Sequence, residues 1–178
     1  SIGQRHLRNL KILMPEAEIM AYRTFNNVPF LDDENNPCKK IDLINHYKIK
    51  EYSNLNDALS QKPNMVFVTN PSKFHSQSAI EALKIGAFVF IEKPLSIDLE
   101  SAYEILEFEK RIGKKLCMIG FQYRYNSALI KLKELLGENI IGKIVNGEIA
   151  NGEYLPYWHP YEDYSKGYAA VKKLGGGA

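Results

Sequence analysis

A lysine with an acidic neighbour follows a run of apolar residues near the middle of the chain. Residues 87–91 read AFVFI, and Glu92, Lys93 and Pro94 come directly after them. Pro94 supplies no backbone N–H and charged side chains are costly to bury, so a strand would end here. Such a lysine can hydrogen-bond a substrate hydroxyl and assist proton transfer. From spacing alone a surface pair between Lys93 and Glu92 is the better reading, since such pairs are common and weak.

Polar residues follow other apolar runs in the same way. This pattern favours Lys93 as a site residue over a surface ion pair with Glu92. Residues 17–24, 64–71 and 115–121 each read as a strand that stops at polar or turn-forming residues. The residues at these ends are Tyr22, Arg23 and Thr24, then Thr69, Asn70 and Pro71, then Gly120, Phe121 and Gln122. Parallel strands bring their carboxyl ends to one edge, where open α/β folds bind ligands. We therefore favour Lys93 as a site residue.

Helical patterns lie between these strands and position them. Residues 3–14 carry Leu7, Leu10 and Met14 at helical spacing and stop before Pro15. The segments 75–86 and 98–113 each have an apolar stripe and a glycine at the end. Strands that alternate with helices of this length predict a doubly wound parallel α/β sheet covered on both faces.

The pattern changes after residue 119. Residues 126–137 predict an amphipathic helix, and residues 142–164 alternate like a long antiparallel strand before an aromatic-rich loop. We expect a Rossmann-like domain at 1–119 and the start of an α+β domain with a mostly antiparallel sheet at 120–178.

Both ends of the chain interrupt a pattern. A helix opens directly after Ser1, Ile2 and Gly3, as if a glycine-rich turn had lost its first half, and the chain stops in the run LGGGA. We expect a first strand before Ser1 and further chain after Ala178. The 178 residues alone are predicted to bind dinucleotide poorly and to be inactive.

Composition excludes several classes of protein. The chain has 178 residues, 45% hydrophobic and 25% charged, with a net charge of +2 and no long basic block, so nucleic acid is not an expected partner. No apolar run approaches the ~20 residues of a membrane span. The two cysteines, Cys38 and Cys117, lie far apart without a metal-binding context, which predicts a cytoplasmic protein without structural zinc.

Arg23 bears on the choice of a dinucleotide. It lies about twenty residues beyond the glycine turn, where an acidic residue would bind the ribose of NAD. An arginine there can bind a 2′-phosphate, and Thr24 can add a hydroxyl. The sequence therefore favours NADP over NAD.

Several motifs occur in one order: SIG at the start, TNPSKFH after one strand, EKPLS after the next, GFQYRYN, GKI, and finally LGGGA. In this order the chain resembles the glucose–fructose oxidoreductase / inositol dehydrogenase / MocA family of nicotinamide-dependent dehydrogenases. The resemblance implies a Rossmann domain followed by an antiparallel sheet domain, with the cofactor between them. It also implies a sugar-like substrate and a dimer or tetramer of the full-length protein.

The resemblance also assigns roles to individual residues. Lys93 matches the catalytic lysine, and Gly3 matches the last glycine of the phosphate-binding turn. The cofactor-binding positions it implies, together with the arginine and threonine discussed above, are Ile2, Gly3, Arg23, Thr24, Thr69, Asn70, Pro71, His75, Glu92, Lys93 and Arg124. The substrate-binding positions are Lys93, Arg124, Tyr157 and Trp158. No metal ligands are expected.

Alternatives remain at several of these positions. His75 is equally consistent with a helix-capping or solvated histidine. Tyr157 and Trp158 could stack on a sugar ring or could pack their loop onto the sheet. We assign no role to His6 or His46. The function predicted for the whole protein is hydride transfer between a nicotinamide and a carbinol carbon; the alternatives are a dinucleotide-binding sensor without turnover and, less favoured, an interaction domain.

Overall fold

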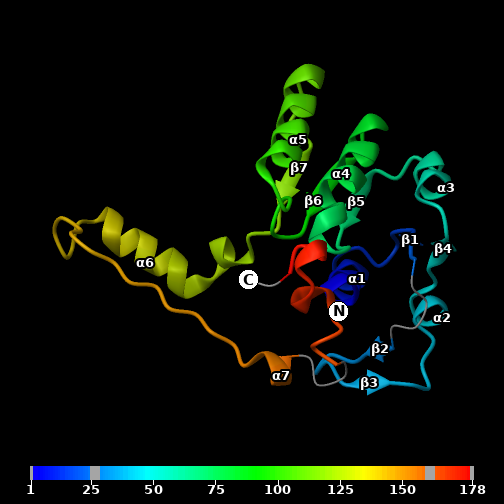
Figure 1. Ribbon diagram of the computed structural model, residues 1–178, viewed down its shortest axis with the longest axis horizontal. Coiled ribbons are helices and arrows are strands. Elements are labelled where there is room, and N and C mark those ends of the chain that lie inside the picture. The colour runs from blue at the N-terminus through cyan, green and yellow to red at the C-terminus, as the bar shows by residue number, and fades with distance from the viewer. Residues whose placement is uncertain (1, 25–28, 159–162, 177–178) are drawn as a thin grey trace.

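The computed structural model describes residues 2–24, 29–158 and 163–176 (Figure 1). Strands alternate with helices over most of the first 119 residues, as the sequence predicts. The strands are β1 (Met20–Tyr22), β2 (Phe30–Leu31), β3 (Pro37–Cys38), β4 (Lys50–Tyr52), β5 (Met65–Val68), β6 (Phe88–Ile91) and β7 (Cys117–Ile119). The α-helices are α1 (Ile2–Leu13), α2 (Leu43–Tyr47), α3 (Leu55–Ser60), α4 (His75–Lys84), α5 (Leu99–Ile112), α6 (Ser127–Gly137) and α7 (Leu155–Trp158). Short 3₁₀ turns are η1 (Ser72–Phe74), η2 (Gln122–Tyr125), η3 (Tyr168–Ala170) and η4 (Lys172–Leu174).

A three-stranded parallel sheet holds the main core. β6 lies between β5 and β7, and the register pairs Val68 with Ile91 and Ile91 with Ile119, so the three strands end in one line. Helices α4 and α5 cover one face of this sheet. The buried side chains there are Leu59, Val68, Ala79, Ala82, Leu83, Val89, Ile91 and Ile105. Each large aliphatic side chain fully buried in this way stabilises the fold by roughly 1.5–3 kcal/mol.

The opposite face of this sheet is covered less completely than the sequence predicts. The ring of His6 in α1 packs against Phe67 and Phe90, with ring centroids 5.5 and 5.0 Å apart. Elsewhere on this face, Phe88 and Met118 remain about half exposed. Two covered faces were expected; among the described residues α1 shields only part of the second one.

Helix ends are set by residues that the sequence already singles out. Asp98 caps α5, because its carboxylate accepts the backbone N–H of Ser101 at 2.8 Å. Gly113 ends the same helix with φ 65°, a left-handed conformation that favours glycine. Gly86 follows α4 with φ 79°. These stops return the chain to the sheet so that β6 and β7 begin in register.

A second parallel pair, β1 and β4, is not joined to β5–β7 by a backbone ladder in the part of the chain that is described. Gln4 attaches α1 to the antiparallel β2–β3 pair: its Nε2 donates to the Pro29 carbonyl at 2.8 Å, and its Oε1 accepts the Leu31 N–H at 2.9 Å. The fold is mixed α/β and Rossmann-like, as predicted.

The region after residue 119 agrees with the predictions only in part. Helix α6 forms where expected, capped by Asn126, whose side chain accepts the Ala128 N–H at 3.0 Å. The long antiparallel strand expected in residues 142–164 does not form in the described part of that segment, and Val145 and Ile149 are 93% and 99% exposed. Alternating side chains make a strand only when another strand supplies hydrogen bonds. Figure 1 shows α6 and the chain after it extending away from β5–β7.

The last described segment, η4, contacts the turn η1 that follows β5. Gly175, directly after η4, has a φ of 88° and lies close to Ile97 and Ser72. A Cβ atom at this position would lie 2.5 Å from Ile97 Cγ2 and 2.9 Å from Ser72 Cβ. A glycine is therefore required by both the backbone conformation and the available space.

Candidate functional site

The carboxyl ends of β5, β6 and β7 place three of the predicted segments side by side. The Glu92 N–H donates to the Val68 carbonyl at 3.0 Å, and the Gly120 N–H donates to the Ile91 carbonyl at 2.8 Å. These hydrogen bonds continue the ladder one residue beyond each strand. The segments that start at Thr69, Glu92 and Gly120 therefore leave the sheet as neighbours.

Lys93 is exposed, and its ammonium has no hydrogen-bond or ion-pair partner among the described residues. The surface pair with Glu92 considered for it does not form. The Glu92 carboxylate instead faces His6, and it reaches Lys93 only through the backbone, where Oε2 accepts the Lys93 N–H at 3.3 Å. The lysine head group is thus free to meet a ligand at the end of β6.

Glu92 is held by His6, a residue to which the sequence analysis assigned no role. The His6 Nε2 lies 2.6 Å from Glu92 Oε1, and the two side chains are 19% and 13% exposed. The histidine ring packs against Phe67 and Phe90, whose rings also contact each other. The signal available in the sequence was position: His6 lies one turn after Gly3, on the helix that must pass beside the strand ends. Glu92 was predicted to contact the dinucleotide; here its carboxylate joins α1 to the end of β6.

His75 is buried, with 1% of its surface exposed. Its Nδ1 lies 2.7 Å from the Pro94 carbonyl and its Nε2 lies 2.8 Å from the Asn70 carbonyl. Both ring nitrogens are therefore engaged within the protein. The predicted cofactor contact stays a prediction, and the geometry favours a role in joining the segments that follow β5 and β6.

The side-chain oxygen of Asn70 is a buried acceptor with no hydrogen-bond donor among the described residues. The Nδ2 of the same side chain donates to Ser78 Oγ at 2.9 Å. Buried polar atoms are nearly always paired, so an open one at a strand end fits a ligand that brings a donor. A dinucleotide carries such donors in its ribose hydroxyls and carboxamide. Thr69 and Pro71, on either side of Asn70, are half-buried.

The start of α1 fits the phosphates of such a ligand. Ile2 and Gly3 lie in the first turn, where backbone N–H groups have no partner inside the helix, and this turn contains no acidic residue. Helix N-termini of this kind attract phosphate groups. The residues present are therefore compatible with a dinucleotide whose phosphates lie at α1 and whose nicotinamide lies toward Asn70 and Lys93.

Arg23 follows β1, as predicted, but an acidic side chain lies beside it. The Arg23 guanidinium is 3.3 Å from Glu51 Oε1 on the neighbouring strand β4. Thr24 is exposed next to it. A 2′-phosphate at this arginine would have to share the guanidinium with the Glu51 carboxylate.

Two of the predicted substrate residues after residue 119, Arg124 and Tyr157, are exposed in this structure. Arg124 in η2 is exposed, with its guanidinium 5.8 Å from the ring centre of Phe121. Tyr157 in α7 is 79% exposed, and its ring packs edge-on against Tyr154. Trp158 is the last residue of α7. Their substrate roles stay predictions.

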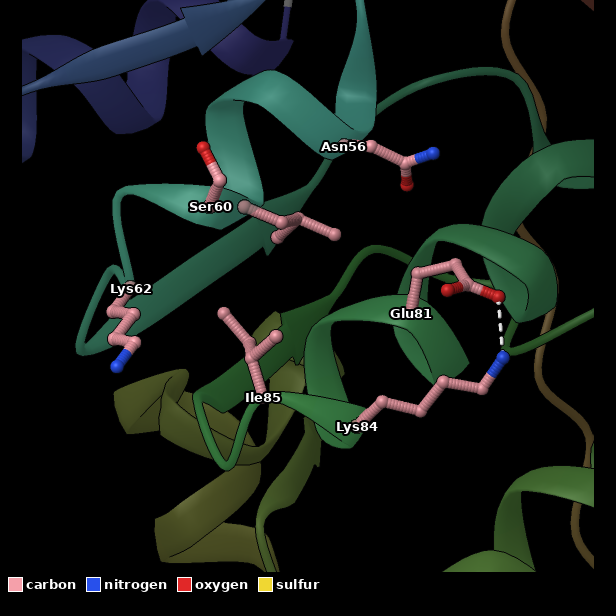
Figure 2. Close-up of a pocket in the computed structure, with 7 residues that line it drawn as sticks. Asn56, Ser60, Lys62, Glu81, Lys84 and Ile85 are labelled. Atoms are coloured by element: carbon pink, nitrogen blue, oxygen red, sulfur yellow. Dashed lines mark hydrogen bonds and ion pairs between the residues drawn. The ribbon is translucent and has the colours of Figure 1, made fainter.

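A hollow of about 330 Å³ lies elsewhere, between α3 and α4 (Figure 2). It is lined by Asn56, Leu59, Ser60, Lys62, Glu81, Lys84 and Ile85. Lys84 pairs with Glu81 at 2.7 Å across its rim. It contains none of the predicted site residues, because α4 runs away from the carboxyl ends of the strands.

Two further observations concern the described residues as a whole. None of their helices is long and apolar enough to cross a membrane. Their His, Cys, Asp and Glu side chains form no group of three or more that could hold a metal ion.

The parallel strand ends, the open helix start and the buried amide acceptor together define a dinucleotide-binding α/β domain. Comparison with known proteins agrees: the family model described as "Oxidoreductase family, NAD-binding Rossmann fold" (GFO_IDH_MocA) matches residues 1–121. The chain belongs to this family.

Similar proteins include inositol dehydrogenases. The chain is 32% identical over 144 residues to an inositol 2-dehydrogenase/D-chiro-inositol 3-dehydrogenase of Lacticaseibacillus casei, which covers 80% of this chain and 39% of that protein. The solved structure of a myo-inositol dehydrogenase from Lactobacillus casei with NAD(H) and myo-inositol matches 80% of this chain and 40% of its own, with 29% identity and a TM-score of 0.62. A myo-inositol 2-dehydrogenase from Lactobacillus plantarum matches with 25% identity and a TM-score of 0.66, over 81% of this chain and 40% of its own. The chain thus spans about two fifths of the length of each of these relatives.

Proposed function

We propose that this chain is the dinucleotide-binding part of an NAD(P)-dependent oxidoreductase acting on a CH–OH group of a cyclitol, sugar or nucleotide-linked sugar. The observation that carries the proposal is the free ammonium of Lys93 at the end of β6, beside a strand end with an open buried acceptor at Asn70. Membership of the NAD-binding family supports the cofactor class, and the inositol dehydrogenases among its relatives support the substrate class.

Lys93 is the proposed catalytic residue. Its ammonium donates a hydrogen bond to the reacting oxygen of the substrate and takes part in moving the proton of that hydroxyl. The bound nicotinamide supplies or receives the hydride. Asn70 and the start of α1 hold and orient the dinucleotide, and this placement lowers the entropic part of the barrier.

The test is Lys93→Met in the full-length enzyme. Methionine keeps a similar apolar stem, so we expect cofactor affinity and melting temperature to stay close to wild type while kcat falls by roughly 10²–10⁴-fold. Lys84→Met, at the hollow of Figure 2, is the matched control and should leave kcat unchanged. Cofactor binding without turnover in the wild type would support the alternative, a dinucleotide-binding sensor.

Two neighbouring side chains, Arg23 and Glu51, bear on the preference between NAD and NADP. The preference for NADP predicted from Arg23 is weakened by the Glu51 carboxylate beside it, which would repel a 2′-phosphate and can itself accept ribose hydroxyls. NADP therefore stays a prediction, and NAD(H) is supported by the family and by the inositol dehydrogenase structure with NAD(H).

Three further proposals concern the whole protein. We place the boundary between the dinucleotide-binding domain and the substrate domain at 119/120, supported by the end of β7 at Ile119. We propose a cytoplasmic protein, supported by the free thiols of Cys38 and Cys117. A dimer or tetramer of the full-length protein is the expected assembly, and sedimentation of the intact protein would determine it.

A further inference from the structure

The residues on both sides of Lys93 are each held by a histidine from a different helix. Before Lys93, Glu92 Oε1 accepts from Nε2 of His6 in α1 at 2.6 Å. After it, the Pro94 carbonyl accepts from Nδ1 of His75, the first residue of α4, at 2.7 Å. The backbone N–H of Lys93 completes the arrangement by donating to Glu92 Oε2 at 3.3 Å.

We propose that His6 and His75 are positioning residues that fix where the Lys93 ammonium lies; this inference rests on the catalytic role proposed for Lys93. A lysine side chain is flexible, and this one has no partner for its head group within the described chain. The backbone of residues 92–94 then determines which positions the Lys93 ammonium can occupy. Reacting groups displaced by about 1 Å can slow catalysis by about 10²-fold.

His75 does more than hold Pro94, because the same ring also contacts the segment after β5. Its Nε2 lies 2.8 Å from the carbonyl of Asn70, the residue with the open amide oxygen. One buried ring therefore sets the distance between the proposed cofactor acceptor and the proposed catalytic lysine. Carbonyl oxygens only accept, so both contacts are hydrogen bonds when each ring nitrogen carries a proton.

His6 links the Lys93 segment to α1, the helix whose first turn is the proposed phosphate site. The ring of His6, which belongs to α1, packs against both Phe67 and Phe90, which also contact each other. Together the two histidines join the phosphate end, the Asn70 segment and the Lys93 segment. Hydrogen bonds in such shielded positions are stronger than in water.

Paired substitutions in the full-length enzyme separate these contacts. Glutamine can place an amide donor where a histidine has Nε2, and asparagine where it has Nδ1. His75→Asn should keep the contact to Pro94, whereas His75→Gln should keep only the contact to Asn70. Likewise, His6→Gln should keep the donor to Glu92, which His6→Leu removes. His46→Gln, on the exposed surface of α2, is the matched control.

We expect kcat to fall by about 10²-fold in His75→Gln and His6→Leu. In His75→Asn and His6→Gln it should stay within a few-fold of wild type, with the KM for NADH little changed in all four. A purely structural role predicts instead that kcat follows the melting temperature, with no difference between the members of each pair.

The same substitutions in a Lys93→Met background separate this inference from the proposed function. If the histidines act through Lys93, they should lower kcat no further once the ammonium is gone. An equal loss in both backgrounds overturns the positioning role. Normal turnover of Lys93→Met alone overturns the proposed function, whereas a slow Lys93→Met with wild-type turnover in all histidine variants overturns the positioning role alone.

Discussion

Gly120, at the end of β7, allows the sheet and the candidate site to approach each other, and Gly120→Ala tests this. Its N–H donates to the Ile91 carbonyl at 2.8 Å, so the backbone cannot move away without losing that bond. An added Cβ would lie 2.8 Å from Cζ of Phe90, 3.2 Å from its Cε1 and 3.4 Å from Glu92 Oε1. Carbon atoms prefer separations of about 3.5–4.0 Å, so the ring of Phe90 has to move.

The expected magnitude follows from where that ring would go. Phe90 packs against His6 and Phe67, with centroids 5.0 and 5.3 Å apart, so its movement disturbs the residues that hold Glu92. Overpacking of a filled site costs about 1–3 kcal/mol. We expect the free energy of unfolding to fall by an amount in this range, and kcat of the full-length enzyme to fall as Glu92 and Lys93 shift.

Urea denaturation with and without the substitution measures the first effect, and steady-state kinetics measures the second. Gly137→Ala, at the end of α6, is the control: a Cβ there meets nothing within 4 Å, so its stability should be unchanged or slightly raised. The steric argument is refuted if Gly120→Ala unfolds at the same urea concentration as the wild type.

Two further predictions concern charge. Arg23→Ala should weaken NADPH binding more than NADH binding. Glu51→Gln should strengthen NADPH binding, because it removes a negative charge that repels the 2′-phosphate. Titration of both cofactors checks this, and an unchanged NADPH/NADH ratio in both variants contradicts the assignment of Arg23. Burial, with a smaller contribution from the nearby Glu109 carboxylate, raises the pKa of Cys117 to about 12. Its thiol should therefore react far more slowly with a thiol reagent near pH 8 in the folded protein than in urea. Because the folded pKa lies above the ordinary value of 9.0, the stability contributed by the protonated thiol is complete below pH 9 and is lost as pH rises toward 12. Cys117→Ser should flatten that part of the pH profile of stability.

The sequence predicts the first domain well because its signals are local. Gly86 and Gly113 end helices at the residues expected, and the apolar runs before Thr69 and Glu92 form neighbouring parallel strands. Lys93 lies at a strand end, as the following proline indicates. Each of these features depends on residues close together in the chain.

The missed features depend on residues distant in the chain. His6 and Glu92 are separated by 86 positions, and a histidine on a helix gives no sign of its partner across the sheet. The same holds for Glu51, which changes the environment of Arg23 from a neighbouring strand. The prediction of a long antiparallel strand after residue 141 was wrong. Alternating side chains describe one segment alone and do not show whether a partner strand lies beside it.

β6 lies between β5 and β7, so a hydrogen-bonded ladder runs along each of its sides. Local opening of β6 would break both ladders at once, and segments with more such bonds open at higher free energy. The amide protons of the backbone that leads into Lys93 should therefore exchange slowly with solvent.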